Sequence, residues 1–421
     1  MRSLPEGARY RRGCRWAAAV IGGLLTPLPT SAQMVLLDRP GGSLELTGYV
    51  QSLSGVLRLP EVLDSGWSGL NGGVARLAWT ARLGEQVVVE VHDRLLMQAG
   101  SGSDVGVAGI GVSAVPERRI DLRTTLLEGE DLLLWHDLDR LSMTVYTPWA
   151  DVTLGRQAIT WGGGLLFPVS DLWGRFSPFE LDTQQKPGVD AVRALAYPGE
   201  GMELDLVVAD AGRGEGLSAA GHLTVSRGWG DVWGGGGKFW DEMIVLAGVS
   251  RVLETTNVRI EGAIPWTVDD EEWQDPRVTL GVDRIGVRWS WSGEVHLNGL
   301  GARDPEGYLT VLAGEALARG ESYLLGRWYA GGAVSWAPDA EGRLRLAVSV
   351  QGNLDDGSAA ILPVASYDVG QSGRITLGGL LTTGDEPGLI DMAGAPLPVL
   401  RLHSEFGSYG QFGYLQMALY F

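Results

Sequence analysis

The chain ends on an alternating strand with nothing after it. Counted back from Phe421, residues 414–421 alternate between an apolar face and a mixed face, which indicates a β-strand. A soluble domain seldom ends flush on such a strand, because the exposed end frays and associates with other chains. A barrel in the outer membrane of a Gram-negative cell can end this way, since its last strand closes against its first. The apolar face carries Leu415, Met417 and Leu419, and the face expected to line the lumen carries Tyr414, Gln416, Ala418 and Tyr420.

The other end of the chain has the pattern of a secretory signal peptide, predicted over residues 1–32. A basic segment precedes the short apolar run 16–25, and Thr30-Ser31-Ala32 supplies small residues before a cleavage point. The apolar run is too short to span a membrane as a helix. Arg11-Arg12 leaves a twin-arginine signal as the alternative. Cleavage would remove Cys14, so we expect the mature chain, 33–421, to have no disulfide or cysteine metal site.

Composition agrees with a single all-β domain whose faces alternate between lipid and water. Outside the signal peptide, no apolar run approaches the ~20 residues of a membrane helix, and mean hydropathy is +0.05. The formal net charge is −18, which argues against nucleic acid as a partner. We therefore predict an antiparallel up-and-down transmembrane β-barrel, integral to the outer membrane.

The chain contains eighteen candidate strands, with sixteen as the alternative count. Short turns alternate with longer connections, as expected when every second connection is periplasmic and the others are external. An even number of strands puts both termini in the periplasm. The predicted short turns lie at Gly84, 148–149, 198–201, Gly230, 254–255, Ser292, 339–342 and Ser372. The candidate strands are 43–58, 71–83, 85–97, 132–147, 150–161, 188–197, 202–209, 219–229, 231–240, 242–253, 256–267, 277–290, 293–303, 322–337, 343–354, 359–370, 373–383 and 405–421.

Strand parity assigns charged side chains to the lumen and apolar ones to lipid. Opposed charges across a lumen could select polar or charged solutes; alternatively, they pair along neighbouring strands and stiffen the wall. Outward Trp79, Trp328 and Trp336 could sit at the membrane interfaces. The side chains predicted to face the lumen are Glu45, Arg76, Arg82, Glu90, His92, Arg94, Arg140, Glu203, Asp205, Arg259, Glu261, Asp283, Glu294, Arg327, Arg343, Arg345 and Arg374.

One long connection, residues 162–187, carries too many aromatic residues for a freely solvated loop. Glycines and prolines break its strand pattern, so its Trp and Phe side chains need shelter. We expect an inward-folded loop that narrows the lumen, with Asp171, Trp173 and Arg175 at the constriction. The alternative is an outer lid packed on neighbouring loops.

The segment around this loop also carries a resemblance. The run Gly-Arg-Gln-x-Ile-Thr-Trp-Gly at 155–162, followed by an aromatic loop and Lys-Pro-Gly-Val-Asp-Ala at 186–191, resembles uncharacterised porin-like outer-membrane barrels. It is more loosely similar to the alginate-export type of eighteen-stranded barrel. The resemblance implies a solute channel. It does not extend to alginate, because a pathway for a polyanion should be markedly cationic and the predicted lumen is mixed in sign.

The favoured function is therefore passive diffusion of small polar or charged solutes, with a substrate-specific export or uptake channel as the alternative. A barrel enzyme or non-conducting surface protein is the alternative of another class. No catalytic, cofactor or metal residues are predicted, since the five histidines fall in no catalytic motif. Expected partners are outer-membrane lipid and lipopolysaccharide, small polar solutes, and the barrel-assembly machinery, which would read Phe421 as an assembly signal. The acidic run 269–272 could bind divalent cations or simply be solvated.

Overall fold

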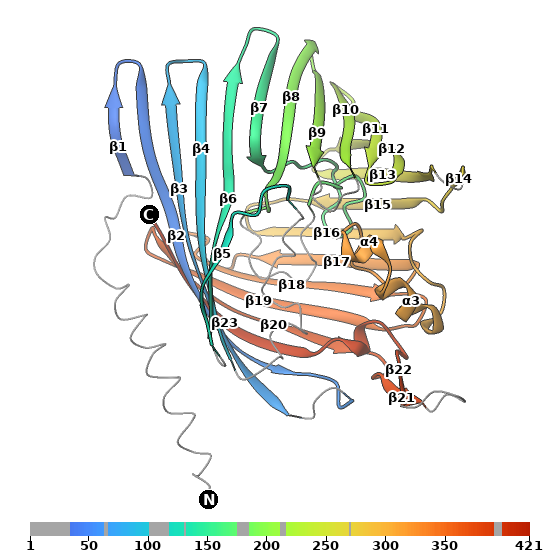
Figure 1. The fold of residues 1–421 in the computed structure, drawn as a ribbon. Coiled ribbons are helices and arrows are strands. Elements are labelled where there is room, and N and C mark those ends of the chain that lie inside the picture. Colours follow the sequence, from blue (N-terminus) through green and yellow to red (C-terminus); the bar gives the residue numbers. More distant parts are fainter. Residues whose placement is uncertain are drawn as a thin grey trace, which may run out of the picture.

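A closed ring of eighteen antiparallel strands forms the molecule (Figure 1). The computed structural model describes residues 34–62, 66–100, 118–129, 132–174, 185–210, 216–268, 271–390 and 398–421. The predicted signal peptide lies outside these residues. The strands of the ring are β2 (Gly42–Arg58), β3 (Trp67–Leu83), β4 (Val87–Gly100), β6 (Leu132–Tyr146), β7 (Ala150–Gln157), β8 (Val189–Gly199), β9 (Met202–Asp210), β10 (Leu217–Arg227), β11 (Gly230–Phe239), β12 (Glu242–Leu253), β13 (Thr256–Thr267), β15 (Arg277–Arg284), β16 (Trp289–Leu297), β17 (Trp328–Trp336), β18 (Leu344–Asn353), β19 (Ala359–Val369), β20 (Gly373–Thr383) and β23 (Gln411–Tyr420).

The last strand closes the ring against the first, as predicted. β23 pairs with β2 in a register that runs from Tyr49 opposite Tyr420 to Arg58 opposite Gln411. Phe421 completes the seam, because its N–H donates to the Gly48 carbonyl at 3.0 Å and its carbonyl accepts from the Gly48 N–H at 2.8 Å. A closed ring has no free edge to associate with another chain, which removes the liability of a chain that ends on an apolar strand.

Three short strands extend the wall where a ring strand stops early. β1 (Met34–Arg39) pairs with the start of β2, on the same edge that β23 takes further along. β5 (Arg123–Glu128) pairs with β6, and β14 (Glu272–Trp273) pairs with β13. The long connections also hold β21 (Gly388–Ile390), β22 (Val399–Arg401), α3 (Tyr308–Leu312), α4 (Glu315–Ala318), and the 3-10 turns η2 (Pro305–Gly307) and η3 (Phe406–Ser408).

The two faces of the wall differ as the sequence predicts. Leu280, Val295 and Met417 are exposed on the outer face, while their neighbours Thr279 and Glu294 are buried on the inner face. Exposed tryptophans mark both ends of the strands, as in the aromatic girdles of membrane barrels. Trp149, Trp229, Trp289 and Trp336 lie near short turns, and Trp67, Trp273 and Trp328 lie near long connections. Among the described residues, no helix is long and apolar enough to cross a membrane.

The strand prediction was correct in number and wrong in detail at several connections. The predicted strand 150–161 ends at Gln157, and the predicted strand 293–303 corresponds to β16, which ends at Leu297. Ser292 is not a turn: it lies inside β16, opposite Asp283 of β15, and the turn falls at 285–288. The predicted strand 322–337 begins only at Trp328, and 405–421 begins only at Gln411. In both places the residues before the strand instead pack around a buried carboxylate, Glu405.

Candidate pore and constriction

The connection between β7 and β8 folds into the ring (Figure 1). Two inward carboxylates of the wall hold its first half through backbone N–H groups. Glu294 of β16 accepts from Leu165, Leu166 and Phe167 at 2.7, 2.9 and 2.9 Å. Glu261 of β13 accepts from the N–H groups of residues 163 and 169 at 2.8 and 2.7 Å. An ionised carboxylate only accepts hydrogen bonds, so it suits a turn that presents several N–H groups at once.

Glycines let the loop approach the wall this closely. Gly162 has φ +87°, and a Cβ there would lie 2.9 Å from Glu261 Oε2. On the wall side, a Cβ at Gly331 of β17 would meet Leu166 at 3.0 Å and Phe167 at 3.2 Å. The left-handed conformation at Gly162 favours glycine, and both sites leave little space for a side chain. The glycines that break the strand pattern in the sequence therefore serve the inward fold.

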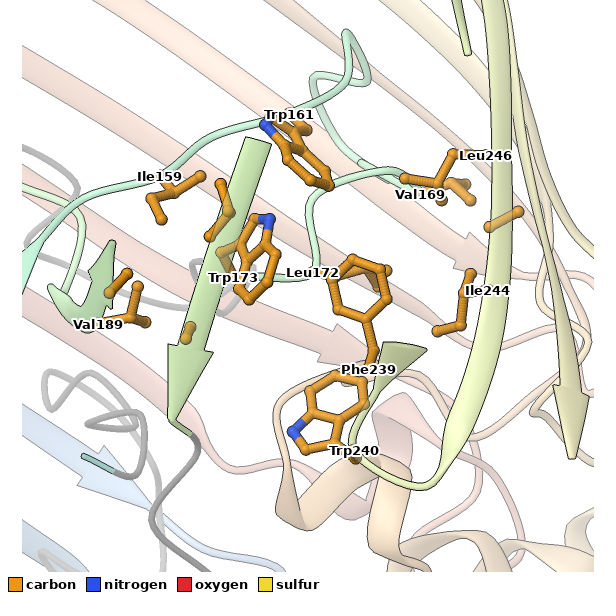
Figure 2. Close-up of a cluster of buried hydrophobic side chains, with 14 residues drawn as sticks. Ile159, Trp161, Val169, Leu172, Trp173, Val189, Phe239, Trp240, Ile244 and Leu246 are labelled. Atoms are coloured by element: carbon orange, nitrogen blue, oxygen red, sulfur yellow. The ribbon is translucent and has the colours of Figure 1, made fainter. Parts of the chain in front are cut away.

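The loop and the wall enclose a hydrophobic core inside the barrel, shown in Figure 2. Trp161 lies edge-on to Trp173 at 5.4 Å between ring centroids and stacks on His222 of β10 at 5.2 Å. Its indole N–H donates to Asp205 of β9 at 2.8 Å. Phe239 of β11 packs against Trp173 at 4.8 Å. The aromatic residues of the loop are thus sheltered by the lumen wall, which confirms the inward-folded interpretation for the described part of the loop.

An ion pair fixes the return of the loop to the wall. The Lys186 ammonium donates to Asp171 and, at 2.6 Å, to the Ile159 carbonyl. Asp171 and Trp173, both predicted constriction residues, are buried in this packing. Arg175 lies outside the described residues.

A cluster of charged side chains covers the lumen face of β3–β8. Asp139 of β6 sits at a β-bulge, where the register with β4 shifts between His92 and Asp93. A bulge breaks strict alternation, so Asp139 and its neighbour Arg140 are both buried in the lumen face. Asp139 pairs with Arg76, and Arg118 of the preceding connection bridges it to Asp137, with both contacts at 2.9 Å.

Further pairs continue this cluster along the wall. Asp137 also binds Arg94 at 3.1 Å, and Arg156 binds Asp190 at 2.7 Å. Asp137, Asp139, Arg156 and Arg118 were not among the predicted residues. The bulge hides Asp139 from a parity argument, and Arg118 reaches the wall from a loop whose direction no local pattern specifies.

The predicted lumen charges fall into two groups. The first group is buried or partly buried. Its buried members are Arg76, Arg94, Arg140, Asp205, Arg259, Glu261, Asp283 and Glu294. Its partly buried members are His92, Glu90 and Arg327, and Arg327 lies beside Asp275. The second group has six members that lie near short turns. Five are exposed, namely Arg82, Glu203, Arg343, Arg345 and Arg374, and Glu45 is partly buried. The ion pairs mostly join strands that are adjacent or next but one. A pore-lining role for any of them stays a prediction.

Two histidines on the inner face of the wall, one of them the predicted His92, take part in packing. His296 stacks on Phe167, with 5.1 Å between ring centroids, and its Nδ1 lies 2.9 Å from Thr279 Oγ1. His92 Nδ1 lies 3.3 Å from Arg76. Across the described part of the chain, no group of three or more His, Cys, Asp or Glu side chains could hold a metal ion. Residues 269–270 of the acidic run lie outside that part.

An open cavity of about 420 Å³ remains on the side of the lumen away from the hydrophobic core. It lies between Leu165 of the loop and the inner face of β15–β20 and β23. Tyr414 and Gln416 line it, as the parity of the last strand predicts. The loop therefore narrows the lumen from one side, and the cavity lies on the other side.

Solved structures with the same architecture are porins. A BenF-like porin from Pseudomonas fluorescens Pf-5 aligns with TM-score 0.55 and 8% identity over 90% of this chain and 98% of its own. Acinetobacter baumannii OccAB4 aligns with TM-score 0.53 and 8% identity, and Pseudomonas aeruginosa OccK8 (OprE) with 0.53 and 7%, each over 90% of this chain and 98% of its own. No protein-family model and no curated protein matches the chain. At these identities the likeness shows the fold, an eighteen-stranded porin-type barrel; it does not test the looser resemblance to alginate-export barrels.

Proposed function

We propose that the protein is an outer-membrane channel for small solutes. One observation carries the proposal: residues 158–174 are bound to the inner wall by Glu261 and Glu294, and a cavity of about 420 Å³ stays open beside them. A loop that only covered the mouth of the barrel would not need to bind inward-facing carboxylates on two strands of the wall. The porin fold of the structural neighbours supports this function.

Electrical recordings test the proposal directly. Purified protein inserted into planar lipid bilayers should give stable, ohmic single-channel openings. A folded preparation that inserts but never opens would contradict a channel function and favour a non-conducting barrel.

We further propose that both termini and the turns at the Gly342 end of the barrel face the periplasm. The connections at the other end, which include most of the long ones and the short one at Gly357, would then face outward. The mature chain has no cysteine if the predicted signal peptide is removed, so single cysteines can report the side. Gly342 and Gly357 form a matched pair, since both have left-handed φ (+68° and +73°) and open space around the Cβ position. A membrane-impermeant maleimide should label Gly357→Cys on intact cells and Gly342→Cys only after permeabilisation. The reverse pattern would overturn the orientation.

A further inference from the structure

The open cavity is lined almost entirely by uncharged groups. Ser292, Ser335, Ser349 and Thr376 carry hydroxyls on four different strands, and Gln416 adds an amide. Among the described residues that line the cavity, two carry a formal charge, Asp283 and Arg284. The lining of the cavity therefore presents mainly uncharged hydrogen-bonding groups to a solute.

The two charged residues that line the cavity are already engaged or face away, and the nearby Glu294 is engaged as well. Asp283 is buried, pairs with Arg259 and accepts from Asn257 at 3.2 Å. Arg284 follows Asp283 on the strand and is exposed, which places it on the outer face. One carboxylate oxygen of Glu294 accepts hydrogen bonds from the Leu165 N–H and from Arg259. The other oxygen accepts from the N–H groups of residues 166 and 167. A charged solute would lose hydration here without gaining a free counter-charge from the residues that line the cavity.

An aromatic ring supplies the apolar side of the cavity. Tyr414 is partly exposed and stacks on Phe412 at 5.5 Å with 18° between the ring planes. A Cβ at Gly378 would lie 2.5 Å from the Tyr414 ring, so the ring covers that glycine on the neighbouring strand. Leu165 of the loop also lines the cavity. Hydroxyls around an aromatic and aliphatic surface suit a solute with many hydroxyl groups and exposed C–H faces.

We infer that this cavity is a selectivity site for small, uncharged, polyhydroxylated solutes of the sugar type. The inference rests on the proposed channel function and adds the substrate class. A neutral sugar exchanges its hydrogen bonds with water for hydrogen bonds with serine, threonine and glutamine side chains at little net cost. A carboxylate or ammonium of the same size does not recover its hydration.

Three solutes of similar size provide the test. Glucose, glucuronate and glucosamine, each radiolabelled, are loaded into phosphatidylcholine vesicles that contain the protein, and efflux is measured at mildly acidic pH. Glucose should leave at least about tenfold faster than either charged solute. Charged solutes that leave as fast as glucose, or no glucose efflux from vesicles whose protein conducts ions, would overturn the inference and leave the channel intact. The absence of both efflux and ion conductance would overturn the channel as well.

A charge placed in the cavity supplies a second readout. Ser349→Asp puts a carboxylate on the lining, so efflux of glucosamine should rise relative to glucose by several-fold. Ser226→Asp adds the same charge at the end of β10, outside the cavity lining, and should leave the ratio unchanged. Equal effects of the two variants would show that the cavity does not set selectivity. Heat-modifiable migration in gels identifies folded variants for the comparison.

Discussion

At the scale of single residues, the terminal aromatic residue Phe421 packs against a glycine of the first strand of the ring. Phe421 is buried and packs over Gly48, whose missing side chain makes room for the ring. The same arrangement recurs where Phe412 covers Gly55 and Trp233 covers Gly248. An aromatic ring over a glycine restores the packing that the glycine lacks on a strand. A role for Phe421 as an assembly signal remains a prediction, whereas its packing at the seam is a feature of the fold.

Gly48→Val should weaken the seam. A Cβ at this position would lie 2.4 Å from the Arg76 carbonyl oxygen and 2.8 Å from the Phe421 ring, and a backbone oxygen cannot move aside cheaply. We expect a loss of about 1–3 kcal/mol or more in unfolding free energy, measured by urea titration of the heat-modifiable species. Gly228→Val is the control, because nothing lies within 4 Å of the Cβ position there. Equal stability of both variants would contradict the packing account.

At the scale of elements, one buried carboxyl group binds three connections at the same end of the barrel. Glu405 meets the Tyr329 hydroxyl, the Asn353 amide at 2.8 Å and the Leu325 N–H at 3.1 Å. Its backbone N–H donates to Asp356 at 2.8 Å. Burial raises the pKa of Glu405 to about 7, although these hydrogen bonds oppose the rise. The connections before β17, after β18 and before β23 therefore meet at one titratable group.

The stability of this junction should fall as the pH rises. The pKa of Glu405 lies above the ~4.3 of an unfolded glutamate, so between these values the folded junction binds more protons than the unfolded one. Hydrogen exchange in 402–409, corrected for its intrinsic pH dependence, should show better protection at pH ~5 than at pH ~8. Glu405→Gln should flatten this dependence, and Glu341→Gln, exposed in a distant turn, should keep it. Protection that rises with pH would contradict the assignment.

The elements also show which parts of the structure a sequence can predict. Period-two alternation identifies the wall strands, because each strand faces lipid on one side and the lumen on the other. It fails at Ser292, which is predicted as a turn but pairs with Asp283 inside the sheet, and at the Asp139 bulge. The loop's inward fold follows from its aromatic content. The groups that hold the loop could not be predicted in this way. Glu294 binds three N–H groups that lie more than a hundred residues away in the sequence, and no local pattern indicates such a long-range contact.

At the scale of the whole molecule, the barrel encloses two different interiors. On the side of β8–β13, the loop and wall pack as a dry hydrophobic core. On the side of β16–β20 and β23, a cavity with mainly uncharged lining stays open. The buried charges of β3–β8 pair with one another and with Arg118. In the proposed channel, the pore would therefore be eccentric: one half of the lumen would give rigidity and the other half would give passage.

The central claim is that Glu261 and Glu294 hold the loop in place and so set the width of the pore. The most direct test is the single-channel conductance of Glu261→Gln/Glu294→Gln against the unmodified protein. An amide keeps one acceptor oxygen and replaces the other with a donor, so at each site at least one N–H group of the loop loses a partner worth about 1.5–3 kcal/mol. We predict a larger and noisier conductance from a folded double variant, as the loop leaves the wall. A folded double variant with the unmodified conductance would contradict the account.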